Sequence, residues 1–506
     1  MTGTREAPRW LGPALEVVVS LGAAAVMVAA CTNVKVDPLQ RIGQISALAS
    51  IQVRFLWIVV PLIAALFISA KLRGGRWFPM TSRLTCAAFA GLVTGFVGGG
   101  IVVALRGTPY CLNGPHGDMG TIVSWADVMH ENPNIVPGFY PPVFPHLLRW
   151  YMDLTDQPGL HAMKDLQIIG VSLFGPLAYL SWRLLLRPGW ALAIGVVAAL
   201  VVIDPYKPYS NLVLVALIPV SIRYLQTVRR AGERHWFHLV RAGVGYGAVF
   251  GLLCLTYIGW FKWSAPGMLV AGLIVFPWRG ARRQAAILVA VTLVVFAIVT
   301  FSFWTNLSAL QDARAVSGES GPMIQDSYIF FDVITDPAYF AMWKGDLPGL
   351  PQVWPPDGEV GGIGVYSLVM FGALGLAVAI GRRRTAVITV ACVFAGTWFM
   401  RFWTAHYLWN TKLVQLYPRT SIELAHTLLV LAGFAAYYVV ESLVRKSANP
   451  EQLRTNGMIG AACALAMLFG SSASSIADRY MPTPAIAPGR LAYMAHTEYQ
   501  ATLPPE

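Results

Sequence analysis

The chain has 506 residues, of which 56% are hydrophobic and 12% are charged, and its formal net charge is +12. A soluble domain is about 45–50% apolar and about 25% charged, so the composition excludes an ordinary soluble protein. The positive charge does not predict a nucleic-acid partner. Lys and Arg fall in short clusters between apolar runs, which is the topology signal of a membrane protein.

Apolar runs long enough to span a bilayer recur along the whole sequence, which predicts an all-α polytopic membrane protein with about 13 transmembrane helices. Three of the runs are short, and these could be tilted, broken or re-entrant. In chain order the expected spans are 14–31, 54–71, 84–105, 166–183, 190–204, 211–227, 243–261, 267–278, 285–303, 363–381, 386–403, 422–443 and 458–471.

The connections between these runs alternate in charge. One set is short and basic, with almost no acidic residue, and the other set is longer and holds most of the carboxylates. Cytoplasmic loops carry the excess of Lys and Arg in membrane proteins. This predicts a multi-pass protein of the cell membrane, with its N-terminus in the cytoplasm and its acidic loops on the outer face.

Two of the outer loops, 106–165 and 304–362, are too long to be simple turns. Long loops on a rigid scaffold usually carry function. Between Pro145 and Lys164 the aromatic and aliphatic spacing indicates an amphipathic helix on the outer membrane surface. Residues 1–471 are expected to form one membrane domain, and 472–506 a short outer tail.

No sequence motif indicates a bound nucleotide or metal. A P-loop and a Gly-rich dinucleotide motif are both missing, and no Cys/His cluster has the spacing of a structural metal site. We therefore expect no cofactor. An enzyme that forms bonds on the outer face without a nucleotide needs a donor that is already activated. A polyprenyl-phosphate sugar fits, because its lipid lies in the bilayer and its phosphate is a ready leaving group.

The segment Pro115-His116-Gly117-Asp118-Met119-Gly120 places a carboxylate near the membrane boundary in the first long outer loop. We predict that Asp118 is a general base, because transfer to a sugar hydroxyl needs a group that takes the hydroxyl proton. The flanking glycines would let a substrate approach the backbone closely. The alternative is an ordinary Asp in a turn. Asp127 would lie nearby if the segment is helical and could bind the acceptor, or it could be part of a solvated helix face.

Two further places are candidates for substrate binding. Tyr140 and His146 belong to a rigid stretch rich in Pro and aromatic residues, which could stack on sugar rings or form part of an interfacial aromatic belt. Lys207 lies in a tight outer turn, where it could bind a phosphate or anchor the chain at the interface.

A late segment places four cationic or imidazole groups among aromatic residues on the outer side, namely Arg401, His406, Lys412 and Arg419. Cations at this position run against the charge pattern of the other loops. An anionic lipid phosphate would explain them, since Arg and Lys are the usual phosphate partners. Pairing with the outer carboxylates is the alternative. Glu423, at the start of the next span, could orient one of the cations.

Several short motifs together resemble the actinobacterial galactan 5-O-arabinofuranosyltransferases. The resemblance rests on His116-Gly117-Asp118, Tyr140-Pro141-Pro142, Leu416-Tyr417-Pro418-Arg419-Thr420, Asp478-Arg479-Tyr480-Met481-Pro482 and Leu491-Ala492-Tyr493-Met494-Ala495-His496-Thr497. The ethambutol-target arabinosyltransferases share the broader fold.

The resemblance implies a GT-C fold and an inverting transfer of arabinofuranose from decaprenylphosphoryl-arabinofuranose to a galactan-like cell-wall glycan, with Asp118 as the base. Members of the family carry a further soluble outer domain after the last span, whereas this sequence ends at Glu506. Another acceptor or another polyprenyl-phosphate sugar therefore stays open. A transporter or flippase of lipid-linked sugars is the alternative of a different class.

Overall fold

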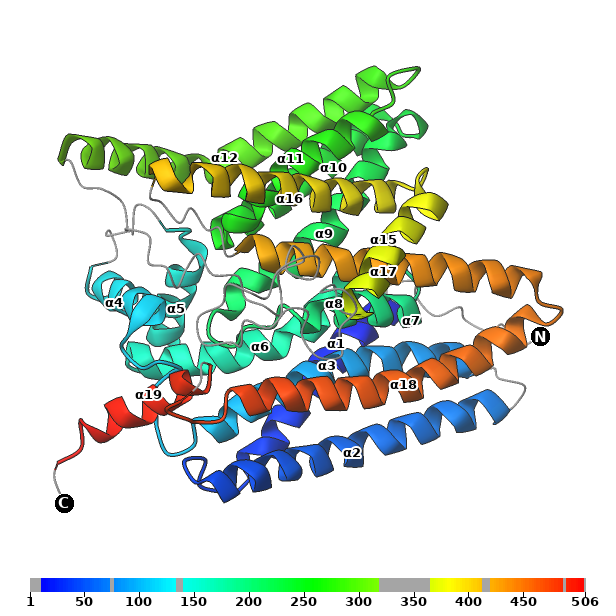
Figure 1. The fold of residues 1–506 in the computed structure, drawn as a ribbon. Helices are drawn as coiled ribbons and strands as arrows, with labels where there is room; N and C mark the ends of the chain where they lie inside the picture. Colours follow the sequence, from blue (N-terminus) through cyan, green and yellow to red (C-terminus); the bar gives the residue numbers. More distant parts are fainter. Residues whose placement is uncertain are drawn as a thin grey trace, which may run out of the picture. The chain divides into compact units, whose positions relative to one another are not determined.

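The computed structural model describes residues 11–72, 77–132, 140–317, 365–411, 419–485 and 488–504, and within these ranges its regular structure is entirely helical (Figure 1). Nine of the described helices are long and apolar enough to cross a membrane. They are α1 (Leu11–Thr32), α2 (Arg41–Lys71), α3 (Phe78–Ala104), α9 (Pro208–Arg229), α10 (Trp236–Thr256), α12 (Arg282–Ser317), α16 (Thr385–Thr411), α17 (Arg419–Lys446) and α18 (Pro450–Arg479). The all-α prediction is confirmed for this part of the chain.

The other four expected spans fall on helices that are shorter or less apolar. The span expected at 166–183 lies in α6 (Gly159–Arg183), which also carries the buried polar side chain of Gln167. Residues 188–200 form α7 (Pro188–Trp190), the π-helix η2 (Ala191–Val196) and α8 (Val197–Leu200). The remaining two expected spans correspond to α11 (Gly259–Val275) and α15 (Val365–Gly381), each of 17 residues.

The chain divides into two compact units. Unit 1 comprises Met1–Val136, Pro145–Val215 and Val444–Glu506, and unit 2 comprises Pro137–Phe144 and Ala216–Leu443. Each unit is described by itself below.

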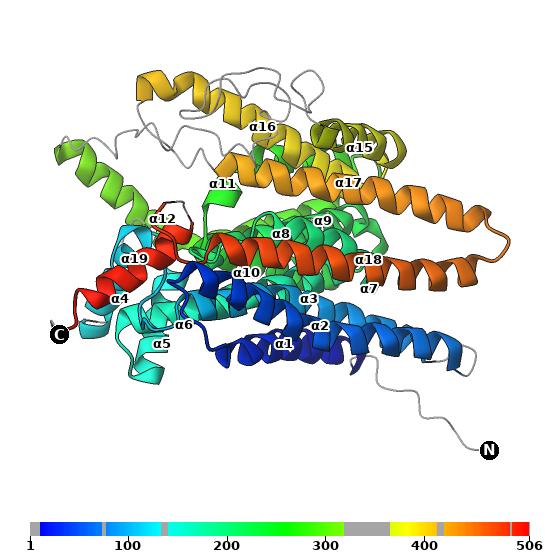
Figure 2. The same ribbon diagram turned by 60° about the horizontal axis from the view of Figure 1, so that its bottom comes forward.

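Helix α3 forms the core of unit 1. It is buried along almost its whole length and contacts α1, α2, α6 and α18, which lie around it in both ribbon views (Figures 1 and 2). Small residues allow these close approaches. A Cβ atom at Gly95 would lie 2.9 Å from the Cα atom of Ala24 on α1. Helices that pack within a membrane commonly meet through such glycines.

One end of unit 1 holds a buried ionic network. Glu16 on α1 is 3% exposed and forms ion pairs of 2.8 Å with Arg83 on α3 and 2.9 Å with Arg183 on α6. Tyr179 donates a further hydrogen bond of 2.9 Å to the same carboxylate. Because its partners come from two other helices, the Glu16 carboxylate ties together the starts of α1 and α3 and the end of α6.

In unit 2, α10 packs against α12 and α11 against α16. The 3-10 helix η3 (Ala231–Glu233) joins α9 and α10, and Ala231 is buried with Leu239 and Leu288. At this same end, Arg229 donates a hydrogen bond of 2.9 Å to the carbonyl oxygen of Arg383. The end of α9 and the connection between α15 and α16 therefore lie together, at the opposite end of unit 2 from the start of α17.

The expected outer loops and the expected tail contain helices. The loop 106–165 contains two helices, α4 (Gly117–Glu131) and α5 (Val143–Thr155), and α5 ends well before Lys164. The loop expected from residue 304 begins later, since α12 continues to Ser317; residues 318–362 lie outside the described residues. Part of the expected tail is also helical, as α18 continues to Arg479 and α19 covers Gly489–Gln500.

Candidate functional site

Asp118 lies in the first turn of α4. His116 is the N-cap residue, and Gly117 has a φ of +64°, in the left-handed region that favours glycine. Gly117 is also crowded, because a Cβ atom there would lie 2.8 Å from the hydroxyl oxygen of Tyr206. A carboxylate in the first turn interacts favourably with the positive end of the helix dipole. The local sequence therefore fixes an ionisable acid at the start of a helix.

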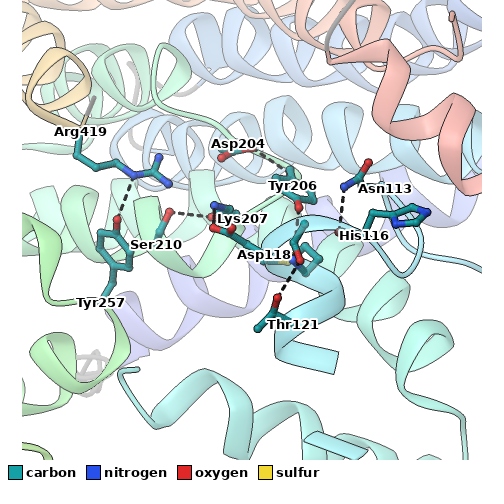
Figure 3. Close-up of polar contacts among 12 residues, drawn as sticks. Asn113, His116, Asp118, Thr121, Asp204, Tyr206, Lys207, Ser210, Tyr257 and Arg419 are labelled. Carbon is teal, nitrogen blue, oxygen red and sulfur yellow. Dashed lines mark hydrogen bonds and ion pairs between the residues drawn. The ribbon is translucent and has the colours of Figure 1, made fainter. Parts of the chain in front are cut away.

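The carboxylate of Asp118 forms an ion pair with Lys207, which comes from the turn before α9 (Figure 3). The Asp118 side chain is 58% exposed, whereas the Lys207 side chain is only 15% exposed. The acid can thus be reached from solvent while the surrounding structure holds its cation. This arrangement suits a carboxylate that is held in place and can contact a bound molecule.

The turn that carries Lys207 is fixed by hydrogen bonds to three other parts of unit 1. Tyr206 donates its backbone N–H to Asp204 (3.0 Å), and Gln167 on α6 donates to the carbonyl oxygen of Tyr206 (3.0 Å). The Tyr480 hydroxyl donates to Asp204 (3.3 Å). The Tyr206 hydroxyl accepts the backbone N–H of Met119, 3.3 Å away. Burial raises the pKa of Tyr206, so this hydroxyl stays neutral and links the turn to α4.

Helix α19 secures the loop that precedes α4. Its Leu491 carbonyl accepts the backbone N–H of Asn113 at 2.7 Å, and Glu498 lies 2.9 Å from the ring nitrogen of His116. His496 is 5% exposed, and its Nε2 atom lies 2.8 Å from the carbonyl oxygen of Ala104. Burial lowers the pKa of His496. These contacts show that residues near both ends of the sequence build the surroundings of Asp118.

Asp127 does not accompany Asp118, although both lie on α4. Nine residues correspond to about 14 Å of rise and roughly half a turn of rotation, so the two carboxylates lie on opposite faces. Asp127 faces Gly159 at the start of α6, and burial raises its pKa. The expectation that a helical segment would bring the two acids together was therefore wrong.

Tyr140 and His146 belong to different units. Tyr140 is half-buried and lies in unit 2, whereas His146 is half-buried on α5 in unit 1. His146 forms no hydrogen bond or ion pair with Asp118 among the described residues. Their predicted contact with a sugar stays a prediction.

The four predicted cations of the late segment have different environments. Helix α16 extends eight residues beyond the expected end of its span, so His406 lies on the same helix as Arg401. Arg401 is 1% exposed and donates hydrogen bonds to Thr420 (2.5 Å) and Ser421 (2.8 Å), whereas His406 is exposed. Lys412 lies outside the described residues.

Arg419 is the most accessible guanidinium among the described cations of this segment. It is half-buried at the start of α17, and its Nε atom donates a hydrogen bond of 3.0 Å to the hydroxyl of Tyr257, as Figure 3 also shows. The guanidinium carbon lies 5.8 Å from the centre of the Tyr257 ring. The ring and hydroxyl of Tyr257 therefore hold the Nε edge of the Arg419 guanidinium.

Glu423 does not orient any of the described cations. Its side chain is completely buried and accepts a hydrogen bond from Ser264 on α11, and it forms no ion pair with Arg401 or Arg419. Its Oε2 atom has no hydrogen-bond partner among the described residues. The carboxylate points from α17 towards α11. Arg401 instead donates its hydrogen bonds to the hydroxyl groups of Thr420 and Ser421 at the start of α17.

Of the predicted site residues, the structure brings together Asp118 and Lys207, both in unit 1. The sequence did not identify Tyr206, Gln167 or Tyr257 as parts of the site. The tight turn around Lys207 was a signal for Tyr206, which directly precedes it. Among the described residues no group of three or more His, Cys, Asp or Glu side chains could hold a metal ion. Comparison with models of protein families found no match, and comparison with curated proteins found none either.

Proposed function

We propose that the protein is a GT-C type glycosyltransferase that uses a polyprenyl-phosphate sugar, with Asp118 as the base. The observation that carries this proposal is the Asp118–Lys207 pair, in which an exposed carboxylate is held next to a mostly buried cation. Nine of the described helices are long and apolar enough to cross a membrane, where a lipid donor would lie. The resemblance to the galactan arabinofuranosyltransferases suggests arabinofuranose as the sugar and a galactan-like glycan as the acceptor.

In this proposal the acceptor hydroxyl loses its proton to Asp118 as its oxygen bonds to the anomeric carbon. The bond from that carbon to the phosphate oxygen breaks, and its electron pair leaves with the polyprenyl phosphate. In an inverting displacement the attacking and leaving oxygens lie on opposite sides of the sugar. A cation in contact with the base is therefore poorly placed to receive the leaving phosphate.

This geometry assigns Lys207 a positioning role. It would hold the Asp118 carboxylate in position, while the donor phosphate binds another cation. Arg419 is our candidate, since Tyr257 fixes its guanidinium and Arg binds phosphate through paired N–H groups. The proposal requires Arg419 and Asp118 to face the same side of the membrane. Single cysteines at each position should then react with a membrane-impermeant thiol reagent added to the outer face.

The test measures transfer of labelled arabinofuranose from decaprenylphosphoryl-arabinofuranose to a galactan acceptor. We expect Asp118→Asn to lower kcat by at least about 100-fold, since general-base catalysis contributes about 10²–10⁴-fold. Lys207→Gln should retain part of the activity, and Lys207→Arg, which keeps the positive charge, should retain more. Wild-type activity in Asp118→Asn would refute the assignment of the base.

The buried ionisable groups of unit 2 favour a second candidate, a transporter of lipid-linked sugars. Arg401 is 1% exposed and Glu423 is completely buried, and ionisable groups inside a membrane often mark a transport pathway. Proteoliposomes loaded with a labelled lipid-linked sugar distinguish the two functions. Movement of the sugar across the bilayer without a new glycosidic bond would favour the transporter.

A further inference from the structure

An elongated cavity of about 630 Å³ lies within unit 2, between α11, α15 and α16. Its walls are apolar except for one arginine, Arg382. The lining residues include Val270 and Ile274 of α11, Val378 of α15, and Val387, Ala395 and Phe399 of α16. Val270 and Ile274 remain 49% and 58% exposed, which shows that the cavity opens to the outside of the unit as a groove.

The groove results from how α11 and α16 approach each other. Gly267 and Gly396 lie at their contact, where a Cβ atom on either residue would collide with the backbone of the other helix. The two backbones therefore touch, as small residues allow in membrane helices. The larger side chains of α11 and α16 flank this contact but do not fill the space beside it, and this space is the groove.

Arg382 is the charged group that lines the groove, and it comes from a run of three arginines. The backbone of Arg383 is bound by Arg229 at 2.9 Å, and the guanidinium of Arg384 lies 6.0 Å from the ring centre of Tyr438. Arg382 is exposed and forms no hydrogen bond or ion pair with any residue that the structure describes. Its neighbour Arg384 therefore provides a matched control of equal charge.

The length of the groove fits one leaflet of a bilayer. Val387 and Phe399 are twelve residues apart on α16, which is about 18 Å at about 1.5 Å per residue. Half of a hydrocarbon core is about 15 Å thick. Arg382 is at one end of this length, where the head group of a lipid in that leaflet would lie.

The position of Arg382 also separates this groove from the cation that we assign to the donor phosphate. Arg229 ties the α15–α16 connection to the end of α9, whereas Arg419 contacts Tyr257 at the end of α10. These two places are at opposite ends of unit 2, because α10 runs from one to the other. A lipid whose phosphate meets Arg382 therefore occupies the other leaflet.

We propose that this groove binds an anionic phospholipid, with an acyl chain along α16 and the head-group phosphate at Arg382. The apolar walls would cover the chain, and the guanidinium would bind the phosphate through charge-assisted hydrogen bonds. The site is independent of the proposed transfer reaction, because neither Asp118 nor Arg419 takes part in it.

The test uses the purified full chain in detergent and native mass spectrometry to measure bound phosphatidylglycerol and phosphatidylcholine with identical acyl chains. We expect the wild type to bind phosphatidylglycerol more tightly. Arg382→Gln should weaken phosphatidylglycerol binding by roughly fivefold, as loss of one basic residue near a lipid head group implies. Arg384→Gln should change it little, and Ala395→Trp, which fills the groove, should weaken binding of both lipids.

Two results would overturn the proposal. If Arg382→Gln and Arg384→Gln weaken phosphatidylglycerol binding equally, the attraction is a general effect of basic charge. If Ala395→Trp leaves the binding of both lipids unchanged, the acyl chain does not use the groove. Thermal unfolding of each variant in lipid-free detergent checks that the substitutions have not disturbed the helices.

Discussion

The close contact between Gly117 and Tyr206 gives a prediction that can be worked out from the structure. Gly117→Ala places a side chain in the left-handed region, at a cost of about 1–2 kcal/mol. Its Cβ atom would also lie 2.8 Å from the Tyr206 hydroxyl, so this hydroxyl must move away from the Met119 N–H that it accepts. Losing that bond costs about 0.5–1.5 kcal/mol, and the total is about 1.5–3.5 kcal/mol.

Gly107 is the matched control. Its φ is +90°, but a Cβ atom there would meet nothing within 4 Å. Gly107→Ala should therefore show only the backbone cost of about 1–2 kcal/mol. Tyr206→Phe completes a double-mutant cycle, because it removes the same hydroxyl that Gly117→Ala displaces. The double variant should be about 1 kcal/mol more stable than the sum of the single effects predicts.

The assay is thermal unfolding in one detergent at fixed pH, combined with the sugar-transfer assay. We expect Gly117→Ala to lower the melting temperature more than Gly107→Ala does. It should also lower transfer activity, since Asp118 follows directly and small displacements of a catalytic group are costly. Equal destabilisation by the two alanine variants, together with strict additivity in the cycle, would refute the reasoning.

Other predictions concern buried ionisable groups. Burial lowers the pKa of His496 in the folded state, so below a pH of about 6.5 the unfolded chain binds more protons than the folded chain. The stability that comes with a neutral His496 is therefore fully present above this pH and is lost as the pH falls. The melting temperature of the wild type should thus fall between pH 7.5 and 5.5, and a fall of the same size in His496→Gln would contradict the assignment. Glu16→Ala should destabilise the protein by about 3 kcal/mol, because Arg83 and Arg183 lose their shared partner; denaturant unfolding measures this, and a cost below 1 kcal/mol would argue against the network. Glu423→Gln should leave the melting temperature nearly unchanged, since it replaces a buried carboxyl that has no ion pair with an uncharged group of the same shape, and a large fall would point to an unrecognised counter-charge.

Hydropathy predicted where the helices are better than where they end. A membrane span must be apolar and must satisfy its backbone hydrogen bonds internally, so its centre is visible in the sequence. Nothing requires the helix to stop at the membrane boundary. α12 and α16 both continue into polar sequence, to Ser317 and Thr411, and this continuation placed His406 on a helix where a loop was expected.

The candidate site was only partly predictable. The segment around Asp118 could be singled out because Gly and His flank an acid in a membrane protein, but its partner Lys207 lies 89 residues away. No periodicity relates the two residues, because their contact depends on how α4 packs against the turn before α9. The separation of Asp118 from Asp127 was predictable in principle, since two residues that are nine positions apart on a helix lie on opposite faces of it.

The contacts of α19 with the loop at 104–116 have a consequence for the order in which the molecule is assembled. A membrane protein is made from its N-terminus and inserted as it emerges. The loop before Asp118 is synthesised early, but its partners Leu491, His496 and Glu498 follow almost four hundred residues later. The surroundings of Asp118 therefore remain incomplete during most of synthesis and form only after α18 is in place. A ribosome-stalled chain that lacks residues 489–500 should contain its spans and still lack an ordered site.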